Sequence, residues 1–569
     1  MASPLPTVPF GKIALSCSGG GYRAASFHLG SMSYLNRLHI GEGPLLEHVR
    51  LISTVSGGTI TGAIYAFMKQ EGRSFEEIYH FLLDRLINID LLHAGIERLN
   101  PDVEWPFVYK RKNLINAFAL QYDQEFTAGA TMDAFAEMKS HLEAVVFNCT
   151  EFDHAVNFRF RNPAWNYSGN FYTRISAKLL SEVKLADVMA SSSCFPGGFE
   201  PMCWPDDYVH EHADTIASLA KRNAEAGRSP MGVMDGGIYD NQGIDSILRY
   251  KERSEDPYFD LIIISDVASP DMKPFQPYKE KPKTGRRTLT LKQVKGKIIK
   301  GNFILGLVLW TVFFVGIIAP FIFNMHANWL AGVCWTLSFF SGIFLWVRSA
   351  IKKRLRSLLL KGLLKIRSHI PAFFLKRLGL FDVDELSVHR AEPLIMDRVN
   401  ALITLLTDVF LKVVRRLNYN RLYENDAYQY RRFSTLIKCL TRDNLGDDAD
   451  GVSSNRKSYF SGNYDADIGP AIEAVVESAA AFGTTLWFTE QEKMDNVMKK
   501  LVATGQITMC YNMILYIEQL KAAKDGEYEQ LNPVAKQSIE SLYAQCLSDW
   551  KIFKSDPLYL VKLDAVNRA

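Results

Sequence analysis

Short apolar runs alternate with segments of helical spacing along the first half of the chain. Four such runs, bounded by polar residues, glycine or proline, are typical of buried strands: Ile13–Ser16, Val49–Thr54, Leu142–Phe147 and Leu261–Ser265. Between them, Ala25–Leu38 and Thr59–Lys69 repeat apolar positions at the period of a helix. This alternation predicts an α/β fold in which a mostly parallel sheet is covered by helices on both faces.

A long uncharged stretch follows the last of these strands. From Gly301 to Val347 there is no Asp, Glu, Lys or Arg. Two nearly continuous apolar segments, 303–323 and 329–347, are separated by the polar residues 324–328. As a helix rising about 1.5 Å per residue, each segment is long enough to cross a hydrocarbon core of roughly 30 Å. The stretch predicts a transmembrane helical hairpin, and a hairpin buried in a large soluble core is the alternative.

Basic segments border this hairpin on both sides. Residues 273–300 hold ten Lys or Arg and one acid, and residues 348–377 hold ten Lys or Arg and no acid. Because positive flanks stay in the cytoplasm, we expect both termini to be cytoplasmic. The second flank also repeats leucine at helical spacing, so the segment 348–389 is expected to lie in the interface and bind anionic lipid headgroups.

Composition adds little about function. Hydrophobic residues make up 48% of the 569 residues and charged residues 22%, with a formal charge of +3. The eight cysteines form no CxxC pair and no cysteine–histidine cluster, so we expect reduced thiols in a cytosolic compartment and no metal site. The N-terminus has no basic segment followed by an apolar core, which predicts no secretory signal.

Helical periodicity returns near the end of the chain. It is present in three segments: Ala391–Leu417, Ala471–Ala481 and Glu490–Thr504. Residues 441–465 are polar and predict a loop or a disordered segment.

Ser56 is the candidate nucleophile. It follows the predicted strand Val49–Thr54, and Gly57 and Gly58 come directly after it. A sharp turn between a strand and a helix exposes a serine hydroxyl and places it at a helix N-terminus. The usual spacing is G-x-S-x-G, in which Thr54 here replaces the first glycine and introduces a steric concern. A serine-rich turn without chemistry is the alternative.

Two further segments complete a possible reacting centre. Gly19–Gly21 follow the first strand and open a helix, so their N–H groups can point at one anion. Asp235 follows an apolar run and precedes two glycines, which suits a base at a strand end. A dinucleotide fingerprint is the alternative for the glycines, and an ordinary turn is the alternative for the aspartate.

These three segments resemble the signatures of the patatin-like phospholipases. The segments are Gly19–Ala24, Thr54–Gly58 and Asp235–Gly237, with Ala24 and Thr54 in place of family glycines. The stretch Ala190–Pro201 also resembles family sequence and is expected to be a strand-to-turn segment near the site. The resemblance covers roughly residues 11–270 and resumes weakly over about 390–520.

The resemblance implies a three-layer α/β/α hydrolase that uses a Ser–Asp dyad and no cofactor. Ser56 would attack an acyl ester and Asp235 would accept its proton. The N–H groups of Gly19, Gly20, Gly21 and Gly57 would form the oxyanion hole. Arg23 would order the glycine loop or contact a phosphate.

Together these features predict a membrane-anchored acyl hydrolase of phospholipase A or lysophospholipase type, of the bacterial membrane-anchored kind and located in the inner membrane. Its partners would be a membrane phospholipid or another acyl-ester lipid; no nucleic acid is expected, and an oligomer is possible. The expected regions are a catalytic domain, a basic linker, the hairpin, a juxtamembrane segment and a C-terminal helical part of the catalytic domain: 1–272, 273–300, 301–347, 348–389 and 390–569. Alternatives are a pore-forming protein with a regulatory hydrolase-like domain, a scaffold with a dead site, and a nucleotide-binding enzyme.

Overall fold

The computed structural model divides the chain into two compact units. One consists of Met1–Met272 together with Thr407–Ala569, and the other of Lys273–Leu406. The structure describes residues 5–566 except for the following positions: 7, 42, 108, 163–166, 252–256, 268–275, 280–287, 324–328, 368–386, 406–408, 442–467 and 524–526. The predicted turn at 324–328 therefore lies outside the described residues, as does the predicted loop at 441–465 apart from Thr441.

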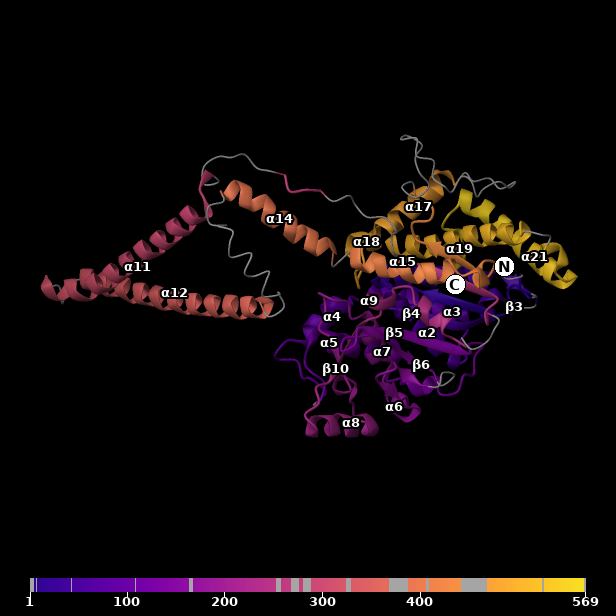
Figure 1. Ribbon diagram of the computed structural model, residues 1–569, viewed down its shortest axis with the longest axis horizontal. Coiled ribbons are helices and arrows are strands. Elements are labelled where there is room, and N and C mark those ends of the chain that lie inside the picture. Colours follow the sequence, from indigo (N-terminus) through magenta and orange to yellow (C-terminus); the bar gives the residue numbers. More distant parts are fainter. Residues whose placement is uncertain are drawn as a thin grey trace. The chain divides into compact units, whose positions relative to one another are not determined.

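A ten-stranded mixed sheet forms the centre of the first unit (Figure 1). Five neighbouring strands are parallel, in the order β12 (Arg432–Leu436), β11 (Leu261–Asp266), β1 (Ile13–Cys17), β4 (Val49–Val55) and β5 (Ala144–Glu151). The other five are antiparallel to their neighbours: β6 (Val156–Arg161), β7 (Ser168–Gly169), β8 (Arg174–Ile175), β9 (Met202–Trp204) and β10 (Met231–Asp235). The predicted α/β class with a mostly parallel sheet is confirmed.

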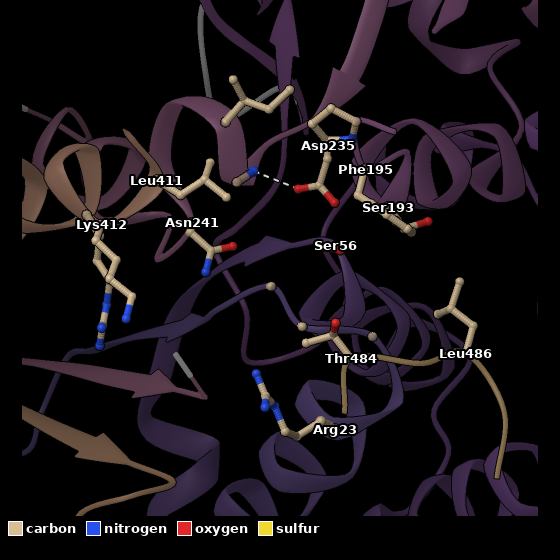
Figure 2. Close-up of a pocket in the computed structure, with 17 residues that line it drawn as sticks. Arg23, Ser56, Ser193, Phe195, Asp235, Asn241, Leu411, Lys412, Thr484 and Leu486 are labelled. Carbon is tan, nitrogen blue, oxygen red and sulfur yellow. Dashed lines mark hydrogen bonds between the residues drawn. The ribbon is translucent and has the colours of Figure 1, made fainter. Parts of the chain in front are cut away.

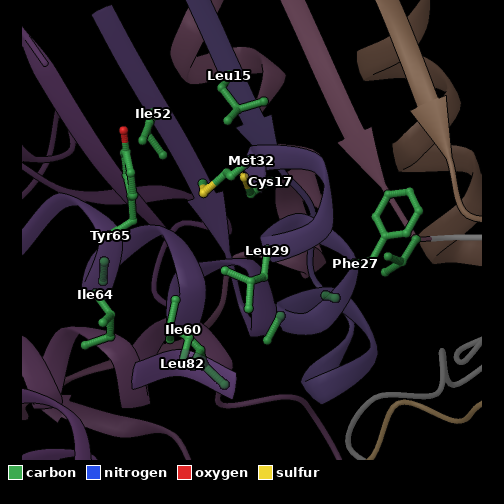
Figure 3. Close-up of a cluster of buried hydrophobic side chains, with 14 of the residues drawn as sticks. Leu15, Cys17, Phe27, Leu29, Met32, Ile52, Ile60, Ile64, Tyr65 and Leu82 are labelled. Atoms are coloured by element: carbon green, nitrogen blue, oxygen red, sulfur yellow. The ribbon is translucent and has the colours of Figure 1, made fainter. Parts of the chain in front are cut away.

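Helices cover both faces of this sheet because successive strand residues point to opposite sides. On one face, Leu15, Cys17 and Ile52 pack with helices α1 (Gly21–Arg37) and α2 (Gly57–Gln70), as Figure 3 shows. On the other face, residues of β1, β4 and β11 pack with α10 (Ile244–Leu248) and with Leu422 of α15 (Phe410–Tyr423).

The C-terminal helices belong to the same unit as the first strands, and Figure 1 shows them side by side in yellow and indigo. Helix α19 (Val497–Lys521) crosses α1 through two glycines. A Cβ atom at Gly30 would lie 2.0 Å from the Val502 carbonyl oxygen, and one at Gly505 would lie 2.1 Å from the Phe27 carbonyl oxygen. The two backbones approach so closely that neither position has room for a side chain.

Several predicted boundaries differ from the structure. Helix α1 begins four residues earlier than expected, at Gly21, where the glycine loop ends. The expected helical stretch 391–417 divides into α14 (Val388–Thr404) and α15, which belong to different units. The predicted helix 490–504 is divided into α18 (Glu490–Met494) and α19 by the left-handed Asn496.

Strand β12 was missed in a part of the chain that was expected to be helical. Its alternating burial suits the edge of a parallel sheet, where only one side chain in two is buried. This pattern covers only five residues, too few to stand out from the helical segments around it.

Two long helices form a hairpin in the second unit. Helices α11 (Leu291–Ile322) and α12 (Trp329–Arg367) are long and apolar enough to cross a membrane by length and composition. The Ser338 hydroxyl donates to the Phe313 carbonyl at 2.7 Å, and Arg348 donates to the side-chain oxygen of Asn302 at 2.9 Å. Most apolar side chains of the pair point outward, as Trp329 and Trp346 do with exposed fractions of 74% and 73%. The side chains that gave the second flank its leucine spacing fall outside the described part.

Candidate active site

Ser56 lies at a strained turn between β4 and α2. Its backbone adopts φ 52° and ψ −123°, a conformation that costs roughly 1–3 kcal/mol for a residue with a Cβ atom. The Ser56 N–H donates to the Ser192 hydroxyl at 3.0 Å, and the Ser56 carbonyl accepts from the Thr59 N–H at 2.8 Å. These bonds hold the strained turn in place and leave the side chain at the wall of a cavity.

The turn packs directly on the glycine loop. A Cβ atom at Gly57 would lie 2.0 Å from the Gly21 carbonyl oxygen, and one at Gly58 would lie 2.4 Å from the Cys17 carbonyl oxygen. Only glycine fits at either position, because each faces backbone that cannot move aside. The two segments that the sequence singled out are therefore in direct contact.

Thr54 fits at the position where the family pattern has glycine. Its hydroxyl is 2.9 Å from that of Thr59, so its polar atom is satisfied inside the protein. Its methyl group faces Gly62 of α2, where a Cβ atom would lie only 2.4 Å away. The missing side chain at position 62 makes the space that Thr54 needs, and the steric concern does not arise.

The glycine loop departs from expectation at Gly19. The Gly19 N–H donates to the Asn241 carbonyl at 3.0 Å, so this group is already bonded and does not point at an anion. Gly20 and Gly21 have φ of 150° and 58°, which favour glycine, and both line the cavity. The first N–H groups of a helix have no intrahelical acceptor, and Gly21 and Gly57 open α1 and α2.

Asp235 reaches the same cavity through the register of the sheet. Val55, the last residue of β4, pairs with Asn148 of β5, and the next residue, Cys149, pairs with Asp235. Because β10 is antiparallel to β5, its final residue arrives at the carboxyl end of β4, beside the serine turn. This places residues 56 and 235 on one cavity wall.

The environment of Asp235 shifts its titration. Burial raises the pKa of the Asp235 carboxyl to about 6. Hydrogen bonds from the Gly237 N–H and the Ser56 side chain act in the opposite direction, but their effect is smaller. The Gly237 bond is 2.7 Å long and is drawn in Figure 2. A carboxyl with a pKa near neutrality can gain and lose a proton easily at physiological pH.

The buried His28 has a structural position. Its ring nitrogens lie 2.7 Å from the Ser265 hydroxyl and 2.8 Å from the Ser18 carbonyl oxygen, and burial lowers its pKa to about 4. Among the described residues that line the cavity there is no histidine.

The cavity has a volume of about 450 Å³ and combines residues from distant parts of the chain (Figure 2). Besides the predicted residues, it is lined by the following: Ser193, Phe195, Pro196, Gly237, Ile238, Asn241, Leu411, Lys412, Arg415, Thr484 and Leu486. The last five come from α15 and from the segment after α17 (Gly469–Ala481). Sequence reasoning missed them because they form no local motif.

Arg23 joins the glycine loop to this C-terminal segment. Its guanidinium donates to the Phe482 carbonyl at 3.0 Å, and the Tyr22 N–H donates to the Thr485 carbonyl at 2.8 Å. Burial lowers the pKa of Arg23, and the charge of Asp266 partly opposes this shift. The contacts favour the loop-ordering role, and Arg23 also lines the cavity.

The segment 190–201 is not the strand-to-turn element that was expected. Residues 190–193 end helix α7 (Leu185–Ser193), and the turn after it carries Phe195 and Pro196 to the cavity. The run of small serines packs inside the protein, where Ser192 donates to the Asn148 carbonyl at 2.8 Å. Its nearness to the site agrees with the expectation.

The model of the patatin-like phospholipase family matches residues 15–248. This segment is a patatin-like phospholipase domain. The match assigns the loop Gly19–Ala24 to this domain and not to a dinucleotide-binding fold. The matched range ends before α15 and the segment 484–486, so part of the cavity wall lies beyond it.

The chain also has similarity to solved structures of human GIVD cytosolic phospholipase A2. One is 13% identical with a TM-score of 0.29, and covers 45% of this chain and 46% of that chain. Another, in complex with methyl gamma-linolenyl fluorophosphonate inhibitor and terbium chloride, is 15% identical with a TM-score of 0.28, and covers 45% and 41%. The chain thus spans less than half the length of these structures. No curated protein matches it.

The strain at Ser56 can be measured with two substitutions that both remove the hydroxyl. We expect Ser56→Gly to be more stable than Ser56→Ala by about 1 kcal/mol, because relief of strain exceeds the entropic cost of glycine. The measurement is the free energy of unfolding of each variant of the full chain.

Ser31, inside helix α1, provides the matched control. There the order should reverse, with Ser31→Ala more stable than Ser31→Gly by about 1 kcal/mol. Equal stability of the two Ser56 variants would show that the turn is unstrained.

Proposed function

We propose that the protein is a membrane-anchored serine acyl hydrolase that cleaves lipid acyl esters at the cytoplasmic face, with Ser56 as nucleophile and Asp235 as base. One observation carries this proposal. In a patatin-like domain, a serine at a strained strand–helix turn and a buried carboxyl with a pKa of about 6 line one cavity.

The proposed reaction has two steps. The Ser56 oxygen attacks the ester carbonyl while Asp235 takes its proton, and the N–H groups of Gly20, Gly21 and Gly57 stabilise the oxyanion. The alcohol leaves with the proton from Asp235, and the acyl group stays on Ser56. Asp235 then takes a proton from water, which attacks the acyl-serine, and returns this proton to the Ser56 oxygen as the fatty acid leaves. Gly19 is omitted from the oxyanion hole because its N–H is bonded to Asn241.

The shape and chemistry of the cavity support an acyl substrate. Its apolar lining comes from Phe195, Ile238, Leu411 and Leu486, which together can contact one acyl chain. The glycine loop, Ser56 and Asp235 line the same cavity, as expected where an ester would react.

The hairpin supports anchoring to a membrane. Most of the described apolar side chains of α11, and of α12 as far as Ile351, face outward, which suits lipid better than water. The basic flanks favour an arrangement with both termini in the cytoplasm, and we propose the inner membrane of a bacterium as its location. Tethering would replace diffusional association with a high local concentration of substrate.

The pore-forming alternative receives less support. Gly316 of α11 packs within the hairpin, where a Cβ atom would lie 2.6 Å from the Cys334 carbonyl oxygen. This small residue serves the contact between α11 and α12, so it offers no surface for a neighbouring molecule.

Loss of either reacting group should abolish hydrolysis. We expect Ser56→Ala and Asp235→Asn each to lower kcat/KM for a short-chain ester by at least about a thousandfold, because each removes an atom that takes part in proton transfer or bond formation. Fluorophosphonate labelling provides a direct measurement, and Ser56→Ala should remove it.

Ser193 also lines the cavity and serves as control. Labelling that persists in Ser56→Ala and disappears in Ser193→Ala would contradict the assignment.

The rate should depend on the ionisation of Asp235. Because the base must be deprotonated and its pKa is raised to about 6, kcat/KM should be low under acidic conditions, rise through about pH 6 and then level off. Initial rates with a soluble short-chain ester across this range would test it. A midpoint near the ordinary aspartate value of about 4 would contradict the raised pKa of Asp235, and a rate that does not change with pH would show that Asp235 does not control it.

Removal of the hairpin should separate anchoring from chemistry. Asn302 and Arg348 lie within hydrogen-bond distance, so deletion of residues 303–347 joins two neighbouring points. We expect the shortened protein to leave the membrane fraction and to keep its hydrolysis of a short-chain ester.

Sedimentation after alkaline carbonate extraction measures the first result, and the ester assay measures the second. A protein that still sediments with membranes would be held by another segment, and loss of ester hydrolysis would show that the hairpin is part of the catalytic fold.

A further inference from the structure

The side-chain amide of Asn241 lies among the reacting groups, although the proposed reaction gives it no task. Asn241 follows the short helix α9 (Gly237–Asp240), is half-buried and lines the cavity. Its backbone carbonyl accepts the Gly19 N–H at 3.0 Å, which holds the residue against the glycine loop. Its side chain makes no hydrogen bond with any other residue that the structure describes. The amide is therefore available to a group that enters the cavity.

Two glycines define where the side-chain oxygen of Asn241 lies. A Cβ atom at Gly19 would be 2.5 Å from Asn241 Oδ1 and 2.9 Å from Ser56 Cβ. A Cβ atom at Gly237 would be 2.6 Å from the same Oδ1 and 3.0 Å from Asp235 Oδ1. The oxygen is thus close to both the serine and the aspartate, and Figure 2 shows it turned toward them.

The second step of the proposed reaction has a use for such an oxygen. The attacking water gives one hydrogen to Asp235, and its other hydrogen can bind one more acceptor. A water that donates two hydrogen bonds of about 2.8 Å joins acceptors roughly 4.5 Å apart, and the distances at Gly237 allow this separation. A neutral amide oxygen suits the position, because a second carboxylate would raise the pKa of Asp235 further.

We propose that the Asn241 side-chain oxygen accepts the second hydrogen of the attacking water and so orients this water toward the acyl-serine. This inference rests on the proposed function and concerns only its second step, because formation of the acyl-serine involves no water. One water proton passes to Asp235 and then to the Ser56 oxygen. The other stays on the oxygen that becomes part of the fatty acid.

The test measures the two steps separately with a short-chain p-nitrophenyl ester. The initial burst of p-nitrophenol reports acylation of Ser56, and the steady rate after the burst reports deacylation. Asn241→Leu keeps the approximate volume of the side chain and removes the acceptor. We expect the steady rate to fall by about ten- to a hundredfold and the burst rate to stay within about twofold. Mass spectrometry of the quenched full-length protein should find the acyl group accumulated on Ser56.

Two further variants of Asn241 keep the test decisive. Asn241→Ala removes the acceptor without adding bulk at the glycine loop, so it should give the same result even if Asn241→Leu does not fold. Asn241→Asp keeps an acceptor oxygen, and its added charge should move the midpoint of the pH profile upward. At a pH above this midpoint, Asn241→Asp should accumulate no acyl group.

Asn418 offers a matched control for damage to the turn. It lies on α15 and does not line the cavity, and its side-chain N–H donates to the Tyr239 carbonyl at 3.1 Å, two residues before Asn241. Asn418→Ala loosens the same turn but leaves the amide of Asn241 in place, so the ratio of the two rates should not change. Accumulation of acyl-serine equal to that in Asn241→Leu would assign the effect to the turn and overturn the proposal.

The remaining outcomes also decide the matter. Equal losses in both steps of Asn241→Leu, or no loss in either, would overturn the role of Asn241 while leaving the hydrolase function in place. Hydroxylamine is a stronger nucleophile than water and depends less on orientation, so it should restore turnover of Asn241→Leu and release a hydroxamic acid. Failure to restore turnover would show that the acyl-serine has become inaccessible, which would overturn the proposal. A wild-type protein that neither cleaves the ester nor carries an acyl group on Ser56 would overturn the proposed function and this inference with it.

Discussion

The serine turn and the glycine loop pack backbone against backbone, and the rest of the site depends on that contact. Gly57 and Gly58 lie against the carbonyls of Gly21 and Cys17, at distances where any side chain would collide. The contact brings the start of α2 beside the start of α1, so two helix N-termini face one cavity. The dipoles of the two helices therefore favour a negative charge at this part of the cavity.

The register of the sheet places the Asp235 carboxyl beside the cavity, and buried hydrogen bonds hold the Ser56 turn next to the same part of the sheet. Because Cys149 follows Asn148 on β5, Asp235 arrives one residue beyond the end of β4. The Ser192 hydroxyl accepts a hydrogen bond from the Ser56 N–H and donates one to the Asn148 carbonyl. Since Asn148 lies on β5, which pairs with the strand of Asp235, this hydroxyl connects the serine turn to that part of the sheet. The strained backbone at Ser56 persists because the surrounding hydrogen bonds hold it in this conformation.

The sequence predicted those parts of the site that carry a local signal. Apolar runs ending in glycine or serine marked β1 and β4, and the domain match agrees with the three motifs. Lys412 and Leu486 could not be found in this way, because a cavity wall is set by tertiary packing and neither residue lies in a motif. The bonded Gly19 N–H was equally hidden, since its acceptor at Asn241 lies more than 200 residues away.

The same topology explains how the helical hairpin can be inserted into this domain. Asp266 is the last residue of β11 before the inserted unit, and Arg415 lies on the first helix after it. Their buried ion pair of 2.7 Å joins the two points where the chain leaves and re-enters the catalytic unit. Closing a longer loop between fixed points costs little additional entropy. The sheet can therefore carry a long insertion there, while residues of α15 still line the cavity.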